Sequence, residues 1–228
     1  MVEVLNVKEG DKVCDPCCGS GGFLIKAFEH VQNQIDQDIH KQITEHRHGG
    51  NNQRTGAGIG GGESSSATIT INGGYIESIA DSKSAAIGGS LIAEEKVNIT
   101  ITGGTISSNT AATSGGGIYI NYDNNHQNVC TISGSAKINS NKATANSGGG
   151  IINHGILKIE GGTIASNTAK VRGGGIYTSK TLEMSGGTIG GTTDDDKNTA
   201  SLQGGGVYIN DGSFTMSGGT ISGNYAYA

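Results

Sequence analysis

The residues best suited to chemistry lie between positions 14 and 23, where the chain reads CDPCCGSGGF. We expect a short strand over residues 12–14 to enter this glycine-rich turn, and a helix to follow from about Gly22. Such a turn lets the backbone approach a ligand closely, and the first turn of the helix offers free N–H groups. The phrase therefore predicts a small-molecule site.

The same phrase concentrates three of the four cysteines, Cys14, Cys17 and Cys18. This crowding excludes a spread disulfide framework. A Cys-x-x-Cys pair is also half of a zinc site, but a second cysteine pair is lacking. Completing a zinc site would need histidines brought in by the fold, from among His30, His40, His46 and His48. We therefore favour a cofactor loop or a plain loop and predict no metal.

The segment after the loop has helical periodicity. Its apolar residues recur every three or four positions: Leu24, Phe28, Val31, Ile35, Ile39 and Ile43. That spacing places them on one face of a long helix ending near residues 46–49. Composition then changes abruptly. We predict a strand-loop-helix segment over residues 1–46, a linker over 47–55 and a repeat domain over 56–228.

Residues 15–23 resemble the first motif of adenine-specific DNA methyltransferases, especially the modification subunit of type I restriction systems. That family usually reads Asp-Pro-Ala-Cys-Gly-Ser-Gly-Gly-Phe, so Cys17 is the one departure. In the family this loop wraps the methionine end of S-adenosylmethionine. The resemblance implies these cofactor contacts: Asp15, Pro16, Gly19, Ser20 and Gly21.

The catalytic part of that family's site is missing from this sequence. Adenine methylation there uses an Asn/Asp-Pro-Pro-aromatic motif that holds the flipped base. Pro16 is the only proline of this chain, so the motif cannot occur in it. A segment of 46 residues is also too short to build the crevice in which such cofactors bind. We expect a vestigial S-adenosylmethionine motif, no catalytic residues and no independent methyltransferase activity.

The rest of the chain is a glycine-rich repeat. Gly-Gly-Thr-Ile or a close variant starts at six places: Gly73, Gly103, Gly134, Gly161, Gly186 and Gly218. A Gly-Gly-Gly-aliphatic phrase alternates with it, at Gly115, Gly148, Gly173 and Gly204. The intervening residues are strand formers, and an alternating phrase such as LEM at 182–184 precedes most Gly-Gly pairs. The pattern predicts an all-β, right-handed parallel β-helix of about six coils with three strands per coil. Independent hairpins in a sandwich are the alternative, but they do not require such recurrence.

Aligning the units gives further expectations. Ile118, Ile151, Ile176 and Val207 should form one inward ladder, with Cys130 in the core position of Leu157 and Leu182. An asparagine follows the aligned isoleucine by three residues in four units: Asn109, Asn141, Asn167 and Asn224. We predict a corner ladder there, because asparagine tolerates left-handed corners and its amides can chain along a stack. Insertions at 121–127 and 192–197 should project as loops and are where a partner would bind. Asp194–Asp196 lacks a calcium-repeat spacing and is expected to be solvated.

The GGGI and IxxN phrases resemble repeats of bacterial surface β-helix proteins, such as autotransporter adhesins and chlamydial polymorphic membrane proteins. Those repeats carry Ala where this chain has Gly117, and Phe where it has Ile106. The resemblance implies a structural or adhesin-like role with an extracellular ligand or another protein as partner. Open terminal coils would also allow end-to-end self-association.

Charge and targeting signals limit the functions and cellular locations that remain possible for this chain. The net charge of −5 and the scattered basic residues argue against DNA binding by this chain alone. No apolar stretch is long enough to cross a membrane. The repeat type suggests the cell surface, yet the first residues have no apolar core typical of a signal peptide, so the chain as written would be cytoplasmic. Two interpretations follow: a surface-type β-helix joined to a methyltransferase fragment, by gene fusion or by an assembly error, or an inactive member of the methyltransferase family.

Overall fold

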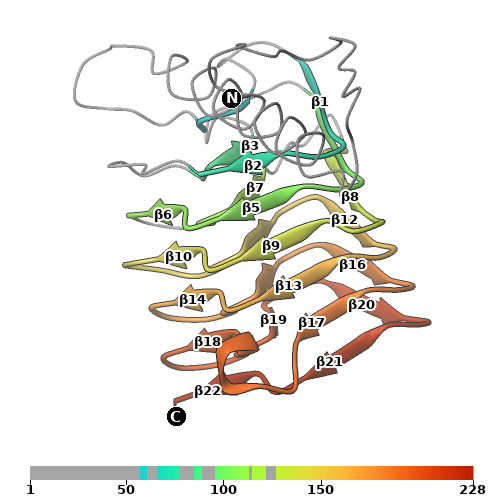
Figure 1. Cartoon of the computed structure of the whole chain (residues 1–228). Coiled ribbons are helices and arrows are strands. Elements are labelled where there is room, and N and C mark those ends of the chain that lie inside the picture. Colours follow the sequence, from blue (N-terminus) through green and yellow to red (C-terminus); the bar gives the residue numbers. More distant parts are fainter. Residues whose placement is uncertain are drawn as a thin grey trace, which may run out of the picture.

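The computed structural model describes residues 57–60, 66–77, 85–88, 96–112, 115–121 and 127–227. These residues form four parallel β-sheets that stack coil upon coil (Figure 1). The predicted helix and the boundaries at 46 and 55 lie outside the described residues. The prediction of an all-β parallel β-helix is confirmed.

The four sheets are numbered here in the order in which the chain visits them. The first contains β1 (Ala67–Ile71), β4 (Val97–Ile101), β8 (Val129–Ile132), β12 (Ile156–Ile159), β16 (Thr181–Met184) and β20 (Ser213–Met216). The second contains β2 (Tyr75–Ile76), β5 (Thr105–Ser107), β9 (Lys137–Asn139), β13 (Thr163–Ala165), β17 (Thr188–Gly190) and β21 (Thr220–Ser222). The third contains β6 (Thr110–Ala111), β10 (Lys142–Ala143), β14 (Thr168–Ala169), β18 (Thr199–Ala200) and β22 (Tyr225–Ala226). The fourth contains β3 (Ile87–Gly88), β7 (Ile118–Ile120), β11 (Ile151–Asn153), β15 (Ile176–Thr178) and β19 (Val207–Ile209).

From β4 onward the chain visits the four sheets in turn and adds one strand to each, and the described chain makes about five turns. The prediction of three strands per coil was wrong, because a coil has four sides. The additional side is the third sheet, whose strands are only two residues long. Two residues are too few to show the period of two by which strands are identified in a sequence.

The core consists of apolar ladders that run along the axis. Ile118, Ile151 and Ile176 pair in register on the fourth sheet, and all three are fully buried. On the first sheet Cys130 pairs with Leu157, which pairs with Leu182. Cys130 is therefore a core residue, as predicted. Burial of each large aliphatic side chain contributes about 1.5–3 kcal/mol to folding.

The triple-glycine phrases are explained by the closeness of successive coils. Their first glycine has a left-handed backbone, as at Gly148 with φ of 68°. The second has no room for a side chain: a Cβ on Gly149 would lie 2.5 Å from the carbonyl oxygen of Gly174 in the next coil. Glycine recurs at this corner because any side chain there would collide with the backbone of the next coil.

The asparagine ladder forms as predicted and is buried. The Nδ2 of each asparagine donates to Oδ1 of the next, over 2.8 Å from Asn109 to Asn141 and 3.0 Å from Asn141 to Asn167. The same Nδ2 of Asn141 also donates to the carbonyl oxygen of Ile106. The side chain of Asn141 thus bonds to both the preceding and the following coil.

Two details of the corner differ from expectation. The left-handed residues are the serines before the asparagines, Ser108, Ser140 and Ser166 with φ of 55–58°. The asparagines themselves act through their side-chain amides. The ladder also includes Asn198, which receives the amide of Asn167 at 2.9 Å and continues to Asn224. The loop before it, with a short 3-10 turn η1 (Asp194–Asp196), displaces Asn198 from the regular sequence spacing.

Replacing Asn167 with alanine should destabilise the fold strongly. The change leaves the main-chain N–H and Nδ2 of Asn141 without the Oδ1 that both contact at 3.0 Å. We expect a loss of about 3 kcal/mol in the free energy of unfolding, measured by urea denaturation. Asn146→Ala, at an exposed corner, is the control and should change it by less than about 0.5 kcal/mol. Equal effects of the two variants would contradict a structural role for the ladder.

Cys130 should resist alkylation in the folded protein. Complete burial raises the pKa of the Cys130 thiol to about 12, so the reactive thiolate is absent at neutral pH. Peptide mapping after iodoacetamide treatment should find Cys130 unmodified in buffer and fully modified in guanidinium chloride. Rapid native labelling of Cys130 would show that the core opens.

Candidate functional site

The residues that sequence analysis assigned to cofactor binding, Asp15, Pro16, Gly19, Ser20 and Gly21, lie outside the described residues. So do Cys14, Cys17 and Cys18. The structure therefore neither assembles nor separates them, and their role stays a prediction. The candidate site that the structure does place is on the outer surface of the β-helix.

Side chains on the outer face of the fourth sheet form a ladder of rings. Tyr119, Tyr177 and Tyr208 occupy the same outward position of β7, β15 and β19, and Ile152 of β11 fills that position between the first two. Ile152 is only 2% exposed although it points away from the core. Its side chain lies close to Gly115 and Gly148, where an added Cβ would be 3.4 Å and 2.6 Å from carbon atoms of Ile152. An apolar cluster is thus built outside the core.

His154 follows β11 and joins this row. Its ring contacts Tyr119 edge-on, with centroids 5.6 Å apart, and Tyr177 in the same manner at 6.0 Å. Tyr177 then stacks on Tyr208 at 5.6 Å with ring planes 27° apart. We call Tyr119, His154, Tyr177 and Tyr208 the aromatic ladder. Edge-to-face and offset contacts of this kind each add about 0.5–1.5 kcal/mol beyond area burial.

Polar and cationic groups border the aromatic ladder. The guanidinium carbon of Arg172 lies 5.2 Å from the Tyr208 ring centroid, and Arg172 Nε donates to Gln203 Oε1 at 3.0 Å. Nδ1 of His154 lies 2.6 Å from Ser179 Oγ in a hydrogen bond. The cation over the ring and the hydrogen bonds hold these side chains in place. Rigid half-buried tyrosines beside an arginine are typical of residues that dominate binding surfaces.

Electrostatics keep His154 uncharged near neutral pH. Burial lowers the pKa of His154 below its usual 6.5, and the positive charge of Lys180 lowers it further. Burial also raises the pKa of the Tyr119 hydroxyl, and together with neighbouring Tyr208 it raises that of Tyr177. All three side chains are thus neutral hydrogen-bonding groups at pH 7.

Of the two insertions predicted to project, the structure describes the second, residues 192–197, in full. Residues 122–126 of the first lie outside the described residues. In the second, the carboxylate of Asp194 pairs with Lys197, which lowers the pKa of Asp194, and Thr193 donates to Asp196 at 2.7 Å. Within the described ranges, no group of three or more His, Cys, Asp or Glu side chains is placed to hold a metal ion. Two carboxylates of the acidic turn, those of Asp194 and Asp196, are thus bound by side chains of the same loop.

Sequence analysis missed the aromatic ladder as a unit. Its tyrosines stand in the repeated phrases GGGIYI, GGGIYT and GGGVYI, so a recurring outward aromatic was visible in the alignment. His154, Ser179 and Arg172 do not recur, and only the stacking of coils brings them to the tyrosines.

Comparison with known proteins separates the two parts of the chain. The N-6 DNA methylase family matches residues 1–70, which include the glycine-rich loop. The match continues past the predicted linker and reaches β1 of the first sheet. No solved structure matches the chain. In the described part of the chain, no helix is long and apolar enough to span a bilayer.

Mild acid should destabilise the protein through His154. The pKa of His154 is lower in the folded state than the 6.5 of the free side chain, so the unfolded state binds more protons just below pH 6.5. The stabilisation is complete above pH 6.5 and falls as the pH drops toward the folded pKa. Melting temperatures across pH 5–7.5, followed by circular dichroism, should decrease toward the acid end.

His154→Gln is the matched control for this titration. Glutamine keeps a hydrogen-bonding side chain but does not titrate, and the variant retains every other histidine of the chain. Its melting temperature should depend less on pH over the same interval. An unchanged slope in His154→Gln would show that His154 is not the group responsible.

Proposed function

We propose that this chain is a non-enzymatic, structural β-helix of the bacterial surface type, with an adhesin-like contact face, joined to an incomplete S-adenosylmethionine motif. The observation that carries this proposal is the aromatic ladder on a rigid scaffold. Its rings are contributed by four successive coils, and each ring is fixed by its neighbours. Preorganised tyrosines lose little side-chain entropy when a partner binds, which favours a recognition surface.

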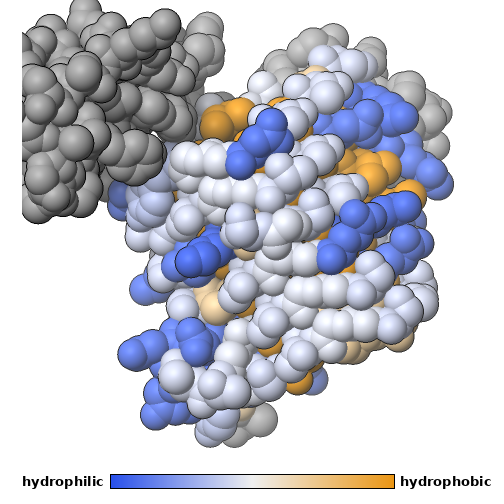
Figure 2. All heavy atoms as spheres, turned by 45° about the vertical axis from the view of Figure 1, so that its right-hand side comes forward, coloured by the Kyte–Doolittle hydropathy of each residue, from blue (hydrophilic) through white to orange (hydrophobic). Residues whose placement is uncertain are grey.

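The scaffold supports this assignment. The inner face of the coils is filled by apolar ladders and by buried amides that bond to one another. The face seen in Figure 2 is mostly pale in hydropathy, with hydrophilic side chains scattered over it and hydrophobic ones visible between them. On the outer face of the fourth sheet, the aromatic ladder combines three tyrosines, a histidine and the guanidinium of Arg172.

Adhesion can be tested with the purified chain coupled to beads and presented to arrays of purified matrix proteins and polysaccharides. We expect saturable binding that Tyr208→Ala weakens by at least about tenfold, the loss expected for an aromatic anchor. Lys158→Ala is the matched control, because Lys158 lies on the first sheet and pairs only with exposed Glu183. Absence of binding to every array, or equal loss in both variants, would contradict the contact face.

A second candidate function rests on the family match over residues 1–70. In this alternative the chain is an inactive fragment or member of the adenine-specific DNA methyltransferases, and S-adenosylmethionine binding is its residual property. The loop of residues 15–21 carries the motif. The absence of an Asn/Asp-Pro-Pro-aromatic motif argues against transfer to adenine by this chain.

Isothermal titration calorimetry with S-adenosylmethionine distinguishes the two functions. We expect no saturable heat with the full chain. Micromolar binding that Asp15→Ala abolishes, with the Asp211→Ala control still binding, would favour the methyltransferase alternative. Sequencing the locus across codons 40–60 from independent DNA would establish whether the junction between the two parts is real.

A further inference from the structure

Basic residues gather in the middle coils of the described β-helix. Residues 127–180, which run from just before β8 to just after β15, contain six lysines and arginines and one acidic residue, Glu160. Their net charge is therefore +5 with histidine neutral, whereas the whole chain has a net charge of −5. The six are Lys137, Lys142, Lys158, Lys170, Arg172 and Lys180. A basic segment in an acidic chain favours an anionic partner for these coils.

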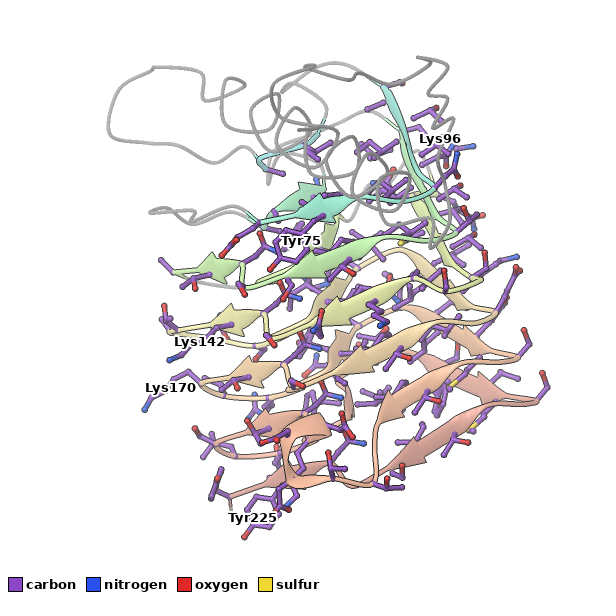
Figure 3. The ribbon with its side chains drawn as sticks, in the orientation of Figure 1. Tyr75, Lys96, Lys142, Lys170 and Tyr225 are labelled. Atoms are coloured by element: carbon purple, nitrogen blue, oxygen red, sulfur yellow. The ribbon has the colours of Figure 1, made fainter. Side chains whose placement is uncertain are left out.

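The fold places three of these cations along one corner of the β-helix. Lys142 lies on β10, Lys170 follows β14 on the next coil, and Arg172 comes two residues later, where the chain turns toward the fourth sheet. Lys142 and Lys170 are exposed and point away from the β-helix on the same side (Figure 3). We call Lys142, Lys170 and Arg172 the basic margin. None of the three forms a salt bridge within the part of the chain that the structure describes.

The basic margin adjoins the aromatic ladder. The guanidinium of Arg172 lies over the Tyr208 ring, and its Nε donates to Gln203. The positive charge of Arg172 also acts on the Tyr177 hydroxyl, since it opposes the rise in the pKa of Tyr177 that burial and Tyr208 cause. Residues 142–155 and 168–180, which cover the third and fourth sheets of two successive coils, contain no aspartate or glutamate. On these two coils aromatic rings and positive charge thus share one surface.

The acidic loop of the next coil lies away from the basic margin. In η1, the carbonyl oxygen of Asp196 accepts from the main-chain N–H of Ser166, and that of Asp195 accepts from its hydroxyl. Ser166 precedes β14, whereas Lys170 follows it, so the two stand at opposite ends of this strand of the third sheet. The carboxylates of η1 therefore do not neutralise the basic margin.

The step of the aromatic ladder fits a chain of sugars. Its ring centroids are 5.6 Å apart from Tyr119 to His154 and 6.0 Å apart from His154 to Tyr177. One such step is close to the length of a pyranose unit in an extended polysaccharide, whereas stacked nucleotides of one strand are about 3.4 Å apart. The rings offer apolar surface to the C–H face of a sugar. Tyrosine hydroxyls and Ser179 Oγ can donate to or accept from sugar hydroxyls.

We propose that the aromatic ladder and the basic margin together bind an acidic linear polysaccharide of the uronate class. The polymer lies along the axis of the β-helix, with its sugar rings against Tyr119, His154 and Tyr177 and its carboxylates toward Lys170 and Arg172. Guanidinium and ammonium groups bind carboxylates through charge-assisted hydrogen bonds. An extended polymer suits a surface whose groups repeat from coil to coil. The inference rests on the proposed contact face and names the class of its ligand.

Polymers of galacturonate test the inference, because the same backbone exists with and without charge. The full chain is immobilised and titrated, by biolayer interferometry, with polygalacturonate and with its fully methyl-esterified form. We expect saturable binding of the acid and at least about tenfold weaker binding of the ester, which has lost the charge-assisted hydrogen bonds. Binding of the acid should also weaken as salt is raised, because salt screens exposed charges.

Charge-matched variants locate the site on the β-helix. Lys170→Gln combined with Arg172→Gln should weaken binding of the acid at least about fivefold, the loss expected for two exposed ion pairs. Lys142→Gln with Lys170→Gln changes exposed side chains only and should weaken it in the same direction. The control pair Lys137→Gln and Lys158→Gln removes equal charge from β9 and β12, on the second and first sheets, and should bind like the wild type. Circular dichroism verifies the fold of each variant.

The outcomes separate this inference from the proposed function. Equal binding of acid and ester, equal losses in the margin and control pairs, or no binding of polygalacturonate would each overturn the inference. Tighter binding of single-stranded polythymidylate through the same residues would indicate a nucleic-acid surface and would overturn it as well. If Tyr208→Ala weakens binding to a neutral polysaccharide or a matrix protein while polygalacturonate does not bind, the contact face stands and its ligand class is wrong.

Discussion

In-register stacking of one coil on the next is the constraint on which this structure depends. Parallel strands lie about 4.8 Å apart, so every position of a coil sees the same position of its neighbours. The triple-glycine corners show how strict this spacing is, because Gly149 approaches the carbonyl of Gly174 too closely for any side chain. Inside the coils the asparagine ladder requires the same spacing, because the side-chain amide of each asparagine donates a hydrogen bond to the asparagine of the next coil. Backbone geometry and buried polar chemistry thus specify one register.

The same constraint produces the surface features. An outward tyrosine that recurs once per coil stacks on its counterpart, and this makes separate aromatic residues into the aromatic ladder. Ile152 shows the consequence, since an outward side chain flanked by Tyr119 and Tyr177 becomes as buried as the core.

The relation between the two parts of the chain matters for function. The family match over residues 1–70 is to N-6 DNA methylases, whereas the described coils build a repetitive scaffold. The match overlaps β1, so the first strand of the scaffold and the end of the methylase-like segment share residues. A catalytic crevice needs several strand ends that converge on one point. The β-helix instead distributes its side chains along an axis, and this geometry suits extended contact surfaces.

The repeat, the inward ladders and the core position of Cys130 could be predicted from the amino-acid sequence, because those features depend on residues recurring at one position of each coil. The sequence also indicated the asparagine corner, although it missed Asn198, which a loop insertion had moved out of the regular spacing. The number of sides of the coil could be learned from the fold alone, since two-residue strands such as β14 have no period to detect. The fold alone placed His154, Ser179 and Arg172 beside the tyrosines, because these contacts join residues that do not recur and meet only when one coil lies on another.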